Sequence, residues 1–457
     1  MTSSDVPMDL IGVGKEVLAR GKRLRGDLEV FVEHSETVSI KAYQGEVESL
    51  VTGAPSGLGV RYVEGSRSGY AYTGDFSGSA LDLVVSMAVS NTAVSDPDEF
   101  VRLPEAPEAY SEVPGLWRPA LLETPIEKKI DLALEAERVA LSSPHIETVE
   151  ESSYVDHASR VAILSSRGVE VYGEQTFCYV YLSAHARAGD DVQTGLGFST
   201  GREPGELDAV AAGREAARKA AALLGARPCP TGRYTVVLDR EAAAAVIGVA
   251  AQALSADAVQ RGRSLFAGRL GERIAADNFT LIDDGLHLDG METTPFDDEG
   301  VPRGVTPLVE KGILSGFLHD TYTAARQGGA ARSTGNARRG GYRVSPGVSP
   351  SNLVLTQGEG TLDELLARVG SGVYVVGITG LHSGANPVTG EFSVGAYGHM
   401  IEDGAVGSPV REITMASDLV ALLTNVSDSA GDARWIPFHG SVLTPSLAIR
   451  EVTVAGS

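Results

Sequence analysis

The chain has 457 residues, of which 43% are hydrophobic and 21% charged, and its 38 Lys and Arg against 60 Asp and Glu give a formal net charge of −22. This length exceeds what one compact core usually holds and predicts two or three domains. A DNA-binding surface neutralises phosphates with Lys and Arg, so the charge argues against nucleic acid as the main partner. No apolar run reaches the roughly 18 residues that a membrane span needs, so we expect no membrane association.

The two cysteines, Cys178 and Cys229, have no CxxC spacing and form no disulfide framework. The N-terminal residues lack a basic region followed by an apolar core, so no signal peptide is expected. Both observations favour a cytoplasmic protein.

The first half of the chain predicts short strands and covering helices. Apolar spacing indicates helices over 8–24, 80–93, 126–142 and 207–224. Ser79 with Asp82 is the expected cap of the second helix. Alternating residues predict strands over 29–33, 37–43, 46–52, 57–63, 68–72, 148–153, 159–165, 170–175 and 177–186. A proline-rich connection covers 96–125, and the run RPCPTG near residue 227 predicts a boundary between domains 1–226 and 227–457.

The second half continues as mixed strands and helices. A strand over 234–238 precedes a helix over 241–254, whose residues are nearly all apolar. Strands are expected over 280–282, 304–309, 313–318, 373–378, 392–401 and 446–454. Thr361 and Glu364 form a capping box that opens a helix ending at Gly370, and Ser417 is the expected cap of a helix reaching about Val426. We therefore predict an α+β fold of two domains, with mixed or antiparallel sheets and covering helices.

Two loops are the candidate binding sites. One is the glycine-rich loop between the strands at 373–378 and 392–401, which exposes His382, Ser383 and Asn386. The other lies in the 38 residues between Asp320 and Glu359, which hold five arginines and no carboxylate. Its polar residues Asn336, Arg338 and Arg339 can hold a peptide backbone or a carboxylate. A solvated loop or a subunit contact is the alternative interpretation.

Several catalytic motifs are absent from the sequence. It contains no nucleophile elbow, no phosphate-binding P-loop and no H-E-x-x-H pair, and no two of its nine histidines lie within five residues of each other. Zinc needs three or four converging side chains, and two histidines on one helix usually supply two of them. The pair His319-Asp320 more often has a structural role than an acid/base one. None of these patterns identifies a catalytic residue or a metal ligand.

Four segments carry a resemblance to a known family. The run LHSGANPVTGEFSVGA (381–396) resembles the signature of the TldD/PmbA family, in particular its PmbA (TldE) branch. Residues 312–324 with 333–339, 409–416 and 444–447 are similar to the family's central and C-terminal segments. The resemblance is most specific over 300–457 and extends more loosely over the rest of the chain.

The resemblance implies a subunit that lacks the family's catalytic metal site. TldD-type subunits bind zinc with an H-E-x-x-x-H helix and a C-terminal cysteine, and they pair with TldE-type subunits to form a metallopeptidase acting on unfolded or small peptides. The corresponding segment here, residues 239–250, contains no histidine, Glu241 stands at its start, and no cysteine follows Cys229. The chain alone is therefore expected to be inactive and to carry no cofactor, with zinc expected in a TldD-like partner.

On this interpretation the chain completes the cavity in which the partner cleaves a peptide or amide-bearing substrate, and natural-product maturation is one such role. Two alternatives stay open. A self-sufficient hydrolase would use another centre, such as His382 with nearby hydroxyls. A non-enzymatic protein-binding modulator would use the acidic surface to attract a basic protein.

Overall fold

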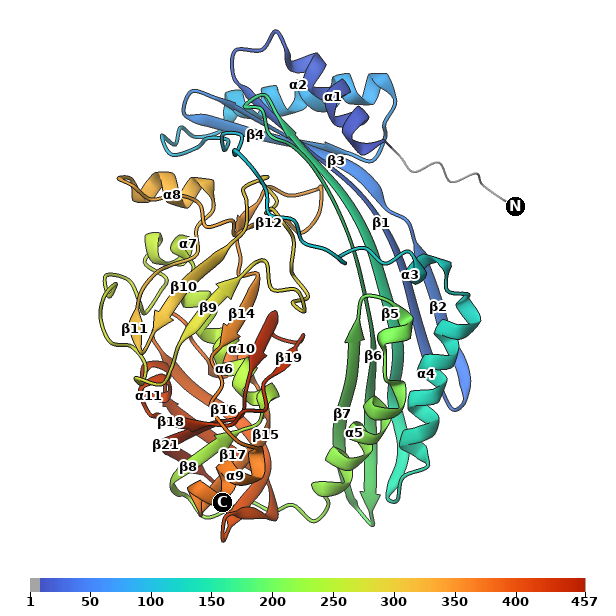
Figure 1. The fold of residues 1–457 in the computed structure, drawn as a ribbon, viewed down its shortest axis with the longest axis vertical. Helices are drawn as coiled ribbons and strands as arrows, with labels where there is room; N and C mark the ends of the chain where they lie inside the picture. Colours follow the sequence, from blue (N-terminus) through green and yellow to red (C-terminus); the bar gives the residue numbers. More distant parts are fainter. Residues whose placement is uncertain (1–8, 457) are drawn as a thin grey trace.

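The structure is a computed structural model that describes residues 9–456. The chain forms two halves that lie side by side (Figure 1). The first half is built on one long curved sheet, and the second half holds two smaller main sheets. The predicted α+β fold with mixed and antiparallel sheets is confirmed. The predicted boundary at residue 227 falls between α5 and β8, and independent folding of the two halves stays a prediction.

The first half contains five α-helices, one short 3-10 helix and seven strands. They are α1 (Leu10–Gly21), β1 (Asp27–Tyr43), β2 (Glu46–Gly53), β3 (Ser56–Glu64), β4 (Arg67–Thr73), α2 (Gly78–Val94), α3 (Ala120–Glu123), α4 (Ile126–Leu141), β5 (Ile146–Ser165), β6 (Glu170–Ala188), β7 (Asp191–Gly201), η1 (Pro204–Glu206) and α5 (Ala209–Ala222). The strands lie in the order β4-β3-β1-β5-β6-β7, and β2 pairs with the second part of β1. Pairing is antiparallel throughout this sheet.

Period-two alternation in β1 decides which side chains face the second half. Val30 and Val32 pack with α1 and α2 in one buried cluster. The residues between them point to the opposite face, because successive side chains of a strand alternate. Phe31 accordingly packs with Phe296 of the second half, and Glu29 is buried on the same face. The upper part of the long sheet is therefore covered on both faces.

The second half contains the remaining elements. They are β8 (Gly232–Leu238), α6 (Arg240–Ala253), α7 (Ala256–Gln260), β9 (Leu281–Asp284), β10 (Val305–Glu310), β11 (Ile313–Leu314), α8 (Thr321–Gln327), β12 (Ala337–Arg338), β13 (Gly347–Val348), β14 (Asn352–Leu355), α9 (Leu362–Val369), β15 (Gly372–Thr379), α10 (Leu381–Gly384), β16 (Glu391–Glu402), β17 (Ala405–Asp418), α11 (Leu419–Thr424), β18 (Val426–Ser429), β19 (Arg434–Ile436), β20 (Ser441–Thr444) and β21 (Leu447–Ala455).

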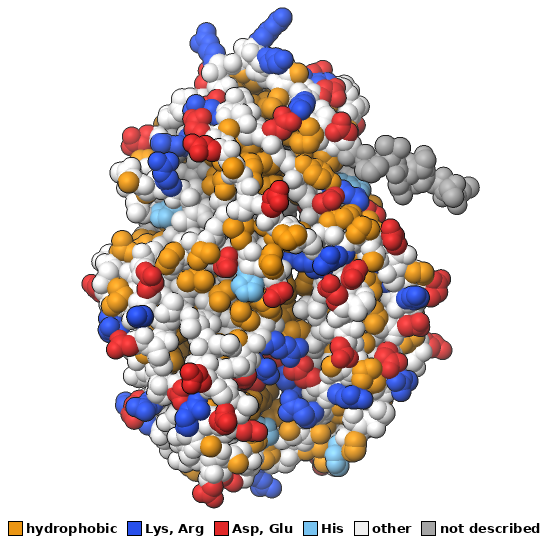
Figure 2. All heavy atoms as spheres, viewed as in Figure 1, with side chains coloured by type: hydrophobic (Ala, Val, Ile, Leu, Met, Phe, Trp, Pro, Cys, Tyr) orange, Lys and Arg blue, Asp and Glu red, His pale blue; other side chains and the backbone are white. Residues whose placement is uncertain are grey.

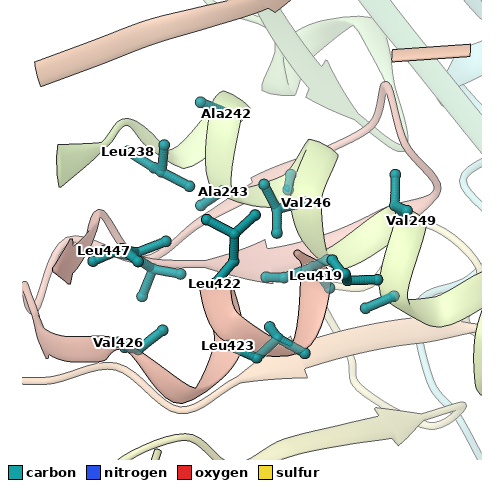
Figure 3. Packing of buried hydrophobic residues seen from close by; sticks show 14 of the residues in the cluster. Leu238, Ala242, Ala243, Val246, Val249, Leu419, Leu422, Leu423, Val426 and Leu447 are labelled. Carbon is teal, nitrogen blue, oxygen red and sulfur yellow. The ribbon is translucent and has the colours of Figure 1, made fainter. Parts of the chain in front are cut away.

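Helix α6 is at the centre of this half. Its sheets have the orders β11-β10-β9-β14-β20-β19 and β17-β16-β15-β8-β21-β18, and parallel pairs occur between β14 and β20 and between β15 and β8. Ten of the 14 residues of α6 are buried. Figure 3 shows Ala243 and Val246 of this helix beside Leu422 and Leu419 of α11. Small side chains let the neighbouring elements approach α6 closely.

Of the three helix caps predicted from the sequence, one is confirmed and two are wrong. Thr361 and Glu364 form the predicted capping box of α9. Ser79 is not a cap, since α2 starts at Gly78 after Ser77, and Asp82 instead binds Arg20 at 2.7 Å. The cap of α11 is Asp418 rather than Ser417, because its carboxylate accepts from two backbone N–H groups.

The strands over 148–165 and 170–186 were each predicted as two short pieces. They form two continuous strands, β5 with 20 residues and β6 with 19. Polar residues at the expected breaks are accommodated because β5 and β6 pair with each other along almost their full length. No helix within residues 9–456 is both long and apolar enough to cross a membrane.

Candidate functional site

The loop with five arginines between Asp320 and Glu359 connects the two halves of the molecule through ion pairs. The guanidinium of Arg339 is fully buried, and it forms an ion pair with the carboxylate of Glu29 on β1. Glu29 also binds Arg61 at 2.5 Å, and Arg61 binds Glu299 at 2.8 Å. The cations lie between carboxylates from both halves, which is the pairing that charges removed from water require. We call Glu29, Arg61, Glu299 and Arg339 the charge cluster.

A tyrosine beside the charge cluster completes this contact. The Tyr342 ring lies against β3, where a Cβ built on Gly57 would come within 2.3 Å of the ring. The Tyr342 N–H donates to Glu33 of β1 at 3.0 Å, and its carbonyl accepts from Tyr70 at 2.7 Å. Glycine is needed at residue 57 because any side chain there would displace the ring. We call the charge cluster, together with these contacts of Tyr342, the closed junction.

The structure therefore gives different surroundings to the predicted site residues. Asn336 is buried and donates to Asp283 at 2.7 Å, so its amide, like the guanidinium of Arg339, is engaged inside the protein. Arg338 is 40% exposed along its side chain and pairs with Glu292.

The glycine-rich loop contains the short helix α10, which the sequence did not predict. His382 and Ser383 lie exposed on α10, and the Asn386 carboxamide oxygen accepts from Val388 at 2.9 Å in a turn. Figure 1 shows α10 apart from β12, so the two predicted loops do not form one site.

A groove runs along the lower part of the junction between the halves. It consists of three adjoining hollows of about 430, 480 and 580 Å³. The first two share Thr200, Asp289 and Trp435, and the last two share Phe198, Ser199 and Arg434. Figure 2 shows charged side chains of both signs around the furrow in the lower middle of this face. We call the three hollows the junction groove.

Two edge strands, β7 and β19, flank the junction groove. Within residues 9–456, β7 pairs only with β6, and β19 pairs only with β20. The Phe198 carbonyl of β7 accepts from Arg434 of β19 at 2.9 Å, so it points away from β6 and into the groove. By the two-residue period of a strand, the N–H and C=O groups of Thr200 point the same way. Such an edge can pair with an extended peptide.

Ion pairs hold the wall of the junction groove in place. Glu215 of α5 binds Lys219 at 3.0 Å and Arg434 at 3.0 Å, and Lys219 also pairs with Glu241 of α6. Burial opposes ionisation of Glu215, but the charges of Lys219 and Arg434 hold its pKa below the usual value. Arg434 also stacks over the Phe198 ring at 4.1 Å. These contacts fix the distance between α5, β7 and β19.

The residues of α6 do not fit a zinc site. The helix contains no histidine or cysteine, and its acidic residue Glu241 is paired with Lys219. One imidazole lies near the helix, since a Cβ at Gly248 would be 3.1 Å from that of His439. Across residues 9–456, no three His, Cys, Asp or Glu side chains are placed to hold a metal ion. One imidazole does not supply the three or four ligands that zinc takes.

The structure is a two-part α+β protein with a groove along the junction of its halves. Comparisons with known proteins identify its family. The chain belongs to the PmbA/TldD family. Its residues 28–92, 119–224 and 231–456 match PmbA/TldA metallopeptidase domain 1, central domain and C-terminal domain. The predicted family resemblance is confirmed.

Relatives and solved structures agree with this assignment. A metalloprotease of Methanothermobacter thermautotrophicus is 31% identical over 88% of this chain and 87% of its own length. Metalloprotease PmbA of Escherichia coli O157:H7 is 27% identical over 96% and 94%. A putative modulator of DNA gyrase from Thermotoga maritima has a TM-score of 0.89 at 25% identity, covering 97% and 99%. TldE from Thermococcus kodakarensis has the same fold, with a TM-score of 0.88 at 24% identity over 97% and 99%.

Proposed function

We propose that this chain is a non-catalytic, TldE-type subunit that pairs with a TldD-like chain to form a zinc metallopeptidase. The observation that carries the proposal is the chemistry of α6, which occupies the segment corresponding to the family's zinc helix. That helix presents alanine and valine where metal ligands would be needed, and its one carboxylate is engaged by Lys219. Zinc is assigned to the partner, and no step of the reaction is assigned to residues of this chain.

The contribution of this chain is to bind substrate. The junction groove offers the edges of β7 and β19 to an extended peptide or another amide-bearing chain, including one from natural-product maturation. Arg338, His382, Ser383 and Asn386 are partly or fully exposed, and we assign them to contacts with the substrate or the partner. Arg339 and Asn336 act indirectly, by fixing the loop that carries Arg338. We place the complex in the cytoplasm, where Cys178 and Cys229 stay reduced.

The test compares this chain alone, a TldD-like partner alone and the two co-purified, by zinc analysis and hydrolysis of an unfolded peptide. We expect almost no zinc in this chain, about one zinc per pair, and hydrolysis only in the pair. A partner whose first zinc-binding histidine is replaced by alanine is the control, and its complex should assemble without hydrolysis. Hydrolysis by this chain alone would instead establish a self-sufficient hydrolase. Stable pairing with no hydrolysis under any condition would favour a binding modulator.

A further inference from the structure

Two arginines on α5 lie at one end of the junction groove. Arg214 and Arg218 line the hollow of about 580 Å³ together with Phe198, Ser199 and Arg434. They are four residues apart on a helix, which places both side chains on the same face. Both are exposed to solvent. A molecule lying in the groove therefore meets two guanidinium groups from one direction.

The carboxylates in the same hollow are already engaged. Asp208 caps α5, with its Oδ1 accepting from Ala211 N–H at 2.7 Å. Glu215 is held by Lys219 and Arg434. Neither Arg214 nor Arg218 has a hydrogen-bond or ion-pair partner within residues 9–456, in contrast to most arginines at this junction. The hollow thus carries uncompensated positive charge in a chain whose formal net charge is −22.

This arrangement opposes the stability of α5 itself. Like charges four apart on a helix destabilise it by about 0.2–0.5 kcal/mol. An anion between the two groups would remove that repulsion. Guanidinium groups present parallel N–H donors that match the two oxygens of a carboxylate, so a carboxylate is the fitting ligand.

We propose that Arg214 and Arg218 bind a carboxylate of the peptide that occupies the junction groove, which makes acidic peptides the favoured substrate class. This inference rests on the proposed peptide-binding function. The peptide backbone pairs with the free edge of β7 near Thr200, and α5 packs on β7, so a side chain leaving that strand reaches the two arginines. The carboxylate comes either from an Asp or Glu side chain or from the C-terminus of the peptide.

Binding of fluorescein-labelled ten-residue peptides to the whole chain tests the proposal, with fluorescence anisotropy as the readout. The peptides consist of Ser, Thr and Val with either two Asp or two Asn at the centre, each with an amidated or a free C-terminus. Tighter binding of the amidated Asp peptide identifies a side-chain carboxylate as the ligand. Tighter binding of the Asn peptide with a free C-terminus identifies the terminal carboxylate.

Two substitutions make the test specific. Arg214→Gln and Arg218→Gln should each weaken the favoured peptide about 3- to 10-fold, and the double variant at least about 10-fold, as for partly desolvated charge pairs. The matched control is Arg23→Gln with Arg25→Gln, which removes the same charge from exposed residues after α1. The control should bind peptide like the unaltered chain. The affinity of the unaltered chain should also fall with added salt more steeply than that of the double variant.

The proposal is overturned if all four peptides bind equally, or if the groove and control variants lose affinity to the same extent. It is also overturned if no peptide binds the chain at any salt concentration tested. These outcomes are separate from the fate of the proposed function, whose readout is zinc content and partner-dependent hydrolysis. A complex that hydrolyses neutral and acidic peptides equally would keep the function and remove the inferred preference.

Discussion

The two halves of the molecule meet at the closed junction and along the junction groove. Both places contain arginine and glutamate side chains, but these differ in burial and pairing. In the closed junction, Arg339 lies at 0% side-chain exposure against Glu29 at 1%, and Tyr342 fills the notch at Gly57. In the junction groove, Glu215 and Lys219 retain 17% and 12% exposure, and adjoining hollows stay open. Arg339 thus joins the two halves where carboxylates surround it, whereas Arg214 and Arg218, which have no such partners, are the residues for which we propose ligand binding.

The largest expected effect comes from opening the closed junction. Arg339→Ala removes one of the two cations bound to Glu29 and leaves a buried carboxylate undercompensated. We expect the free energy of unfolding, measured by urea denaturation, to fall by about 3–5 kcal/mol. The neighbouring Arg338→Ala is the matched control, because its partly exposed pair with Glu292 should contribute only about 0–1 kcal/mol. Equal losses in the two variants would contradict the distinction between fastening and exposed arginines.

A second substitution tests the packing of the same junction. In Gly57→Ala the new methyl group would lie 2.3 Å from the Tyr342 ring, so the ring must move off β3. We expect a loss of about 1–3 kcal/mol in the same denaturation experiment. Gly304→Ala is the control, because a Cβ there meets nothing within 4 Å. Combining Gly57→Ala with Tyr342→Ala should cost less than the sum of the single changes. Strict additivity would mean that the ring and the glycine do not interact.

Some of these contacts could be predicted from the sequence and others could not. The capping box at Thr361 and Glu364 was predictable because both partners lie within one turn of helix. The role of Arg339 was not, because Glu29 lies 310 residues away in the sequence. Five arginines with no carboxylate near them in the sequence indicated a binding loop. In the folded protein, carboxylates from β1 and from residues 297–299 lie beside this loop.

The groove was missed for the same physical reason. Helix α5 was predicted from its periodicity, and Arg214 and Arg218 could be placed on one face of it. No strand was predicted over residues 191–201 or 434–436, where β7 and β19 lie. Nothing local indicated that these two edge strands would come close together, because strand order depends on contacts distant in the sequence. The signal that was present is the pair of arginines four apart on one helix face, of which only Arg218 has an acidic residue, Glu215, at helical spacing.

Acid should destabilise the fold through its histidines. Burial lowers the pKa of four of them, His157, His319, His439 and His399, the last of which stacks on Tyr374. A base whose pKa is lowered by folding contributes its full stability above the unfolded value near 6.5 and loses it as pH falls below that value. We expect this histidine contribution to the free energy of unfolding to fall between pH 7 and pH 5, while buried Asp297, whose pKa burial raises to about 8, gains stability over the same range and opposes the fall.

Replacing one of these histidines should flatten that dependence. His399→Phe keeps a ring over Tyr374 and should remove the share of that histidine contribution that His399 makes between pH 7 and pH 5. The exposed His382→Gln is the control and should leave the dependence unchanged. If both variants kept the full drop, carboxylates rather than buried imidazoles would be responsible for it.

The smallest expected effect is a gain in stability rather than a loss. It separates the groove arginines from those of the closed junction most directly. Arg214→Gln removes a like-charge contact on α5 and should raise the free energy of unfolding by about 0.2–0.5 kcal/mol, whereas Arg218→Gln also removes the attraction to Glu215 three residues earlier and should change it less. Arg138→Gln on α4 is the matched control, since it removes an exposed pair with Glu135 and should lower stability slightly. A groove variant that gains stability while losing affinity for peptide would show that the arginines are kept for binding. A loss of stability like that of the control would instead mean that they have partners in the fold, as Arg339 does.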